Sequence, residues 1–186
     1  MKTAFLSCSI LALTLSQPLF AASYTFDPMH SYVEWKVSHF GFSNQSGKCF
    51  TNGTLNYDPK NPQASQVKAT LKLSDVVTGI PDLDKHLKGK LFFNVEQFPN
   101  ATFVSDKVDV QNQQITKVHG QLTLHGVTKP VTLDVKLNQI GKNPITDKES
   151  IGFSASTKLK RSEFGMTTML PGISDEVPIL IEIEAS

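Results

Sequence analysis

The sequence has little cysteine, little net charge and, beyond its first residues, no long apolar run. Lys and Arg number 18 against 17 Asp and Glu in 186 residues, so no global field attracts nucleic acid. No stretch after residue 22 approaches the roughly 20 apolar residues of a membrane helix, so we expect no stable membrane insertion. The sequence also lacks a phosphate-binding loop, a dinucleotide fingerprint and a G-x-S-x-G elbow. It therefore carries none of these common motifs of nucleotide-dependent enzymes and hydrolases.

The N-terminal segment MKTAFLSCSILALTLSQPLFAA has the pattern of an export signal. A basic start precedes an apolar stretch over residues 4–15, and the small residues Ala21 and Ala22 end the segment. We therefore predict a cleaved signal peptide over residues 1–22 and a single exported, periplasmic domain over 23–186. The alternative is an uncleaved membrane anchor.

The two cysteines are divided between these parts of the chain. Cys8 lies in the predicted signal peptide, which leaves Cys49 as the only thiol of the exported domain. An internal disulfide is then impossible. We interpret Cys49 as a small buried hydrophobe, and the alternative is a reactive or intermolecular thiol.

Apolar and polar residues alternate along about eight segments, which is the period of half-buried strands. The clear segments are 32–39, 66–73, 122–124, 131–137, 151–155 and 177–183, with weaker ones at 53–57 and 101–110. Turn-forming residues separate them, as in the stretch from Gly126 to Pro130, where we expect one connection. Strands joined this closely favour antiparallel neighbours, which close into a barrel or split into a sandwich.

The most helical segment is PDLDKHLK, which begins at residue 81. Asp82 can cap it, and Leu83 and Leu87 share one face. A single helix in an otherwise all-β chain is expected to cover a barrel mouth. Its polar residues, Asp82, Asp84 and His86 with two lysines, could bind a polar head group, or could form only a solvated helix face.

An eight-stranded barrel either fills with side chains or holds one small ligand. Several phenylalanines lie outside the regular strand pattern, where they could line a mouth or plug the barrel ends: Phe40, Phe42, Phe92, Phe93, Phe98 and Phe164. His119 and His125 share a strand face about 20 Å apart, which is too far for one metal ion. We predict neither metal nor cofactor, and we interpret His125, beside a turn, as structural.

Several segments in order resemble the YceI-like family of exported lipid- or polyisoprenoid-binding proteins. They are YTFDPMHSYVEW (24–35), SHFGFS (38–43), DKHLKGKLFFNVEQFPNATF (84–103), GQLTLHGVTKPVTLDVKL (120–137), GFSASTKLKRSEFGM (152–166) and DEVPILIEIEA (175–185). The resemblance implies a lipocalin-like barrel of eight antiparallel strands with a helix near one end. It also implies an apolar tunnel for a long-chain isoprenoid or fatty amphiphile, with the polar head at the mouth.

The leading hypothesis is a periplasmic protein that sequesters or carries such an amphiphile, and a homodimer is possible. The predicted ligand-binding residues are Val33, Trp35, Val37, His39, Leu71, Asp84, His86, Phe103, Leu122, Leu124, Leu133 and Phe153, of which His39, Asp84 and His86 are expected at the polar mouth. One alternative is a stress-related or accessory barrel with a plugged interior. The other is an enzyme acting on lipids with His39 or His86 as general base, although no catalytic constellation supports it.

Overall fold

The computed structural model describes residues 22–186, and residues 1–21 of the predicted signal peptide lie outside the described residues. The strands are β1 (Ala22–Thr25), β2 (Tyr32–His39), β3 (Ser43–Tyr57), β4 (Gln66–Lys72), β5 (Asn100–Gln111), β6 (Gln114–Leu124), β7 (Val127–Lys142), β8 (Glu149–Lys160) and β9 (Glu176–Ala185). The helices are α1 (Pro81–Lys88) and the 3₁₀ turns η1 (Pro62–Ala64), η2 (Leu73–Asp75) and η3 (Arg161–Phe164). None of these helices is long and apolar enough to span a membrane.

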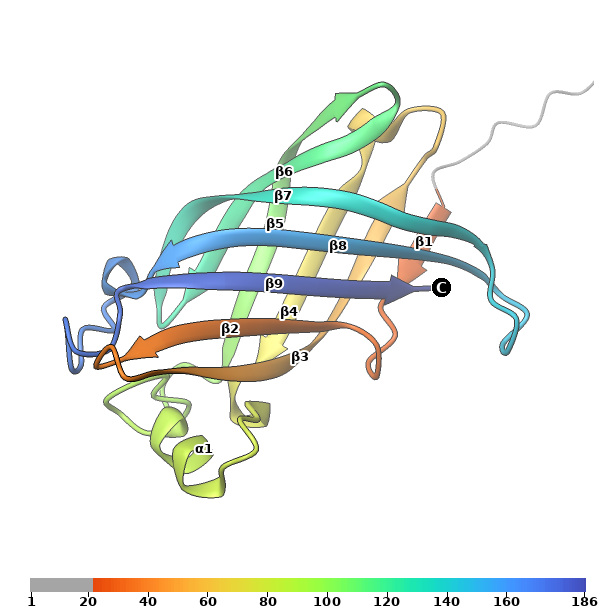
Figure 1. The fold of residues 1–186 in the computed structure, drawn as a ribbon. Helices are drawn as coiled ribbons and strands as arrows, with labels where there is room; N and C mark the ends of the chain where they lie inside the picture. Colours follow the sequence, from red (N-terminus) through yellow and green to blue (C-terminus); the bar gives the residue numbers. More distant parts are fainter. Residues whose placement is uncertain (1–21) are drawn as a thin grey trace, which may run out of the picture.

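The strands form one antiparallel sheet that closes on itself (Figure 1). Neighbours follow the order β3, β2, β9, β8, β7, β6, β5, β4, and β4 pairs back with β3. Strand β1 pairs with the second half of β3 while β2 pairs with the first half, so β1 and β2 share one position in the ring. The predicted eight-stranded antiparallel barrel is therefore confirmed, with β1 as a short addition.

The hairpin between β6 and β7 is tighter than the sequence suggested. Leu124 pairs directly with Val127, which leaves a turn of two residues, His125 and Gly126, with φ angles of 51° and 76°. Positive φ at both positions is the signature of a type I′ turn, whose twist matches that of a hairpin. The predicted connection through Pro130 is wrong in extent, because Pro130 lies within β7. It is tolerated there because β7 pairs with β8 only from Asp134 onward.

Helix α1 has the predicted bounds and lies below one end of the barrel (Figure 1). The predicted cap is wrong: Asp82 makes no capping hydrogen bond, and the N-cap position belongs to Ile80. Asp84 instead accepts hydrogen bonds from the backbone N–H and the hydroxyl of Thr78, at 2.7 and 2.6 Å. These bonds fix the chain that enters the helix. Leu87, a residue of α1, is buried against the barrel. The helix therefore covers this end of the barrel, as expected.

The packed core lies toward the other end, where β9 finishes. Its buried members are Phe26, Leu55, Tyr57, Phe103, Val108, Ile115, Val118, Ile151, Phe153 and Ala185. Two strand glycines make room for its rings: a Cβ on Gly53 would lie 2.7 Å from Phe26, and one on Gly120 would lie 2.6 Å from Phe103. The rings therefore pack flat against the sheet, and they close this end of the barrel.

Candidate functional site

A cavity of about 320 Å³ lies inside the ring. Strands β2 to β9 all contribute inward-facing side chains to it, among them Val33, Leu55, Leu71, Phe103, Leu122, Leu133, Phe153 and Ile179. At the α1 end, Leu83 and Leu87 of the helix also line it. Most of the lining residues are aliphatic or aromatic, so the cavity suits apolar groups.

The burial of the strands shows that the middle of the barrel is hollow. Along β7 every second side chain, including Val131, Leu133 and Val135, faces inward but is only half-buried. In contrast, Phe103 and Phe153 of the packed core are 8% and 7% exposed. Val131, Leu133 and Val135 contact the packed core cluster, yet each stays partly accessible because it also borders the cavity. The barrel therefore has a packed core at the end away from α1 and an unfilled apolar space beside it.

The structure brings most of the predicted ligand-binding residues together. All the apolar ones and His39 line the cavity: Val33, Trp35, Val37, His39, Leu71, Phe103, Leu122, Leu124, Leu133 and Phe153. Phe103 and Phe153 also belong to the packed core, so they support the wall as well as line it. Contact with a ligand remains a prediction for each of them.

Asp84 and His86 are not among the residues that line the cavity. Leu83 and Leu87 occupy the inward face of α1, which turns the polar face of the helix outward. Asp84 is occupied by Thr78, and His86 borders a shallow outer depression with Lys85. Neither residue lines the cavity, and contact of either with a ligand's polar head stays a prediction.

Three other polar side chains lie at the α1 end of the cavity wall: His39, Gln45 and Arg161. The Arg161 guanidinium is buried and donates to three backbone carbonyls, those of Met166 and Ile173 at 2.8 Å and Ser174 at 2.9 Å. Burial lowers the pKa of Arg161, and the nearby charge of Asp175 partly offsets this. Arg161 therefore holds the loop between η3 and β9 against the barrel end.

Arg161 and Gln45 line the cavity but were not among the predicted ligand-binding residues. Lys158 and Lys160, just before Arg161, follow the outward phase of β8 and are exposed. Arg161 instead continues the inward phase of Ala155, Thr157 and Leu159, so strand alternation places it on the cavity side. It was missed because a charged side chain is rarely expected in an apolar interior.

The phenylalanines outside the regular strands were predicted either to line a mouth or to plug the barrel ends. Phe92, Phe93 and Phe164 line the cavity, whereas Phe98 packs against the turn beside His125, with ring centroids 4.6 Å apart. The Nδ1 of His125 donates to the carbonyl of Phe164 at 3.0 Å. His125 thus joins the β6–β7 hairpin to η3, in agreement with its structural interpretation.

Exposed apolar side chains gather on the loops at the α1 end. Phe42 is 93% exposed, and Phe40, Leu91 and Met169 are also exposed. Hydrogen bonds connect their loops, from the Phe40 N–H to the Gly172 carbonyl and from the Thr168 hydroxyl to the Leu91 carbonyl. An apolar rim therefore adjoins residues that line the cavity at this end.

Comparison with known proteins gives consistent matches over the whole domain. The YceI-like domain family matches residues 24–185. Protein YceI of Salmonella arizonae is 39% identical over 186 residues, covering 95% of this chain and 96% of that protein. BcnA of Burkholderia cenocepacia has a TM-score of 0.75 at 24% identity, covering 87% of this chain and 99% of that one. A polyisoprenoid binding domain from Saccharophagus degradans has a TM-score of 0.69 at 15% identity, covering 90% and 98%. Both solved structures support the fold.

Proposed function

Since the chain belongs to the YceI-like domain family, we propose that it is a periplasmic protein that holds one long-chain amphiphile, an isoprenoid or a fatty chain, inside its barrel. The observation that supports this most is the apolar cavity inside the ring, which the packed core closes at the end away from α1. A stable domain of this size usually fills its interior. The cavity therefore suits an apolar cargo.

Burial of the cargo chain supplies the binding free energy. Each buried methylene group contributes about 0.8 kcal/mol, so about 15 carbons contribute about 12 kcal/mol. Association costs at least about 4 kcal/mol in lost translational and rotational freedom. The remaining 8 kcal/mol or so corresponds to a Kd of about 1 µM. Chains much shorter than about 15 carbons are therefore expected to bind weakly.

The polar head of the cargo is proposed to lie at the α1 end. His39, Gln45 and Arg161 are the polar side chains that reach the cavity there, and the exposed rim that includes Phe40 and Phe42 marks the entrance. The opposite end is closed by the packed core. A chain that enters tail first would leave its head among these three side chains.

A matched pair of β4 variants tests the proposal. Leu71 faces the cavity and its neighbour Thr70 faces outward. Leu71→Glu places a carboxylate in an apolar cavity, where an unpaired charge is strongly unfavourable, and it is expected to abolish binding of a fluorescent C16 fatty acid. Thr70→Glu introduces the same charge on the outer face and should leave the Kd unchanged. Retention of the fatty acid by a folded Leu71→Glu variant would contradict the proposed site.

Catalysis on the cargo has less support. A structural neighbour, the domain from Saccharophagus degradans, is a polyisoprenoid binding domain, which favours binding over turnover here. Among residues 22–186, no hydrogen bond joins the His39 side chain to a hydroxyl or thiol, and its ring instead lies 4.7 Å from that of Phe40. His86 faces away from the cavity. A general base without a nucleophile within reach does not support turnover, so binding is the function that the geometry favours.

A further inference from the structure

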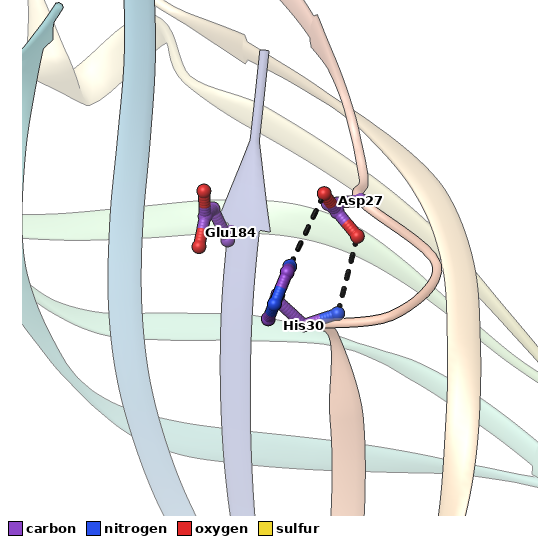
Figure 2. A group of neighbouring side chains, drawn as sticks. All are labelled: Asp27, His30 and Glu184. Carbon is purple, nitrogen blue, oxygen red and sulfur yellow. Dashed lines mark hydrogen bonds and ion pairs between the residues drawn. The ribbon is translucent and has the colours of Figure 1, made fainter. Parts of the chain in front are cut away.

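Three side chains with metal-binding atoms meet outside the cavity, where the connection between β1 and β2 reaches the end of β9. They are Asp27, His30 and Glu184, whose ligand atoms all lie within 4.8 Å of one another (Figure 2). This is the barrel end away from α1 (Figure 1). We propose that Asp27, His30 and Glu184 form a binding site for a divalent transition-metal cation such as Zn²⁺.

The backbone around the three residues is held by hydrogen bonds. The Asp27 N–H donates to the Glu184 carbonyl at 2.8 Å. Ser31, which is 0% exposed, donates from its hydroxyl to the same carbonyl at 2.9 Å and accepts from the Glu184 N–H at 3.2 Å. The positions from which the three side chains project are thus fixed relative to each other. A site built on fixed positions loses little freedom when an ion binds.

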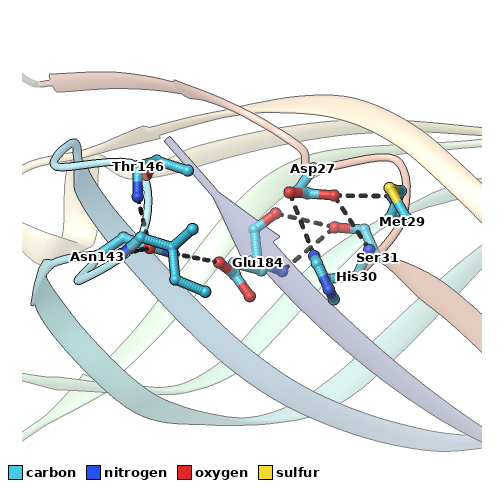
Figure 3. Close-up of polar contacts among 8 residues, drawn as sticks. Asp27, Met29, His30, Ser31, Asn143, Thr146 and Glu184 are labelled. Carbon is cyan, nitrogen blue, oxygen red and sulfur yellow. Dashed lines mark hydrogen bonds and ion pairs between the residues drawn. The ribbon is translucent and has the colours of Figure 1, made fainter.

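Hydrogen bonds also orient the two carboxylates (Figure 3). Asp27 Oδ1 accepts from the N–H groups of Met29 and His30, and Asp27 Oδ2 lies 3.2 Å from His30 Nδ1. Glu184 Oε1 accepts from the Asn143 amide at 3.1 Å. Asn143 is itself fixed, because its oxygen accepts from the N–H groups of Ile145 and Thr146. Outer hydrogen bonds of this kind hold ligands in place around a metal.

The distances and the donor types suit a small ion with a mixed ligand set. In a tetrahedral zinc site, ligand atoms about 2.0–2.2 Å from the metal lie about 3.3 Å from each other. The Asp27–His30 pair already has this spacing, and Glu184 needs to move by on the order of 1.5 Å to complete it. An imidazole nitrogen with carboxylate oxygens favours Zn²⁺, Ni²⁺ or Cu²⁺ over Ca²⁺ or Mg²⁺. The His30 side chain is 61% exposed, so the site is open to solvent and to an incoming ion.

A bound ion would link the β1–β2 connection to the last strand. These segments are already joined here by the hydrogen bonds around Ser31 and by an isolated bridge between Phe26 and Ala185. Backbone hydrogen bonds from Asp27 to Glu184 and between Thr25 and Ser186 add to this connection. The site would therefore reinforce ring closure at the end that the packed core occupies, and it is separate from the cargo cavity. The sequence could not indicate it, because Glu184 joins Asp27 and His30 only when the barrel closes.

The chain supplies its own control. His119 lies 2.8 Å from Asp109 in a second histidine–aspartate pair. In the part of the chain that the structure describes, only the group at Asp27 brings a third such ligand into reach. His119→Ala should therefore leave metal binding unchanged, whereas His30→Ala should remove it.

The test is isothermal titration of chelator-treated protein with ZnCl₂, with a thermal melt of each variant. We expect one Zn²⁺ per chain and a rise in melting temperature, both lost in His30→Ala and in Glu184→Gln. Asn143→Ala should weaken binding by about 10- to 100-fold. The His30→Ala variant should fold because His30 is exposed. The Glu184→Gln variant should fold because the glutamine amide keeps an oxygen that can accept the hydrogen bond from Asn143.

Circular dichroism of each variant establishes that it is folded. The proposal is overturned if millimolar Zn²⁺ produces no saturable heat, or if His30→Ala binds as tightly as the unchanged protein. It is also overturned if His119→Ala loses as much affinity as His30→Ala, because the ion would then bind elsewhere. Loss of binding confined to the His30 and Glu184 variants supports it.

Discussion

The hollow centre of the barrel predicts that enlarging one cavity-lining side chain stabilises the cargo-free protein. Ala155 on β8 lines the cavity and is only half-buried. Ala155→Leu adds three carbons, which contribute about 2.4 kcal/mol at about 0.8 kcal/mol each. Ordering the leucine side chain costs about 0.5–1 kcal/mol. We therefore expect the free energy of unfolding to rise by about 1.5 kcal/mol.

The same substitution in the packed core should have the opposite sign. Ala185 on β9 is 0% exposed and lies in the core cluster opposite Ile151. Added carbons there must displace their neighbours, and overpacking of this kind costs about 1–3 kcal/mol. Ala185→Leu is thus a matched control that differs from Ala155→Leu only in what surrounds the new side chain.

Urea unfolding of delipidated protein measures both effects, followed by the fluorescence of Trp35, the single tryptophan. Ala155→Leu should unfold at a higher urea concentration than the unchanged protein and should bind less fatty acid, because the cavity is smaller. Ala185→Leu should unfold earlier. If both variants are destabilised to the same extent, the centre of the barrel is packed and the container interpretation is wrong.

Three further changes test particular contacts. Arg161→Met should destabilise the protein by about 3 kcal/mol in thermal or urea unfolding, because it leaves one buried and two part-buried carbonyls without their donor. Gly47→Ala should lower cargo affinity in a binding titration, because a Cβ there would lie 2.3 Å from the Trp35 ring and push it toward the cavity. Burial first, and then the charge of Asp75, raise the pKa of Cys49 from 9.0 to about 11. Its thiol should therefore react with iodoacetamide at pH 8.5 far more slowly in folded than in unfolded protein, and its contribution to stability should be lost between pH 9 and about 11.

The barrel could be predicted from the sequence because its signals are local. Alternation of the kind seen around Val131 and Leu133 assigns each side chain to one face of a strand, and this also identified most of the cavity wall. The helix bounds were predictable because Pro81 begins the segment and Gly89 follows it. Neither feature depends on which strands become neighbours.

The features that were missed depend on closure of the ring. Asp84 and His86 were placed at the mouth because they share a short polar segment, but packing of Leu83 and Leu87 against the barrel decided which face of the helix points inward. Alternation along β8 places Arg161 on the inner side, but the partners that hold its guanidinium there are carbonyls of a loop that follows it in the sequence. No local pattern carries this information.

Native mass spectrometry tests most directly whether the cavity holds a cargo. The protein is purified from the periplasm of its native host, the compartment proposed for it, and organic extraction identifies any bound lipid. We expect a mass increment of one long-chain isoprenoid or fatty amphiphile per chain, which is lost in Leu71→Glu and kept in Thr70→Glu. A protein that is consistently free of lipid, and that takes up none from a mixed lipid extract, would contradict the proposal that this barrel is a lipid container.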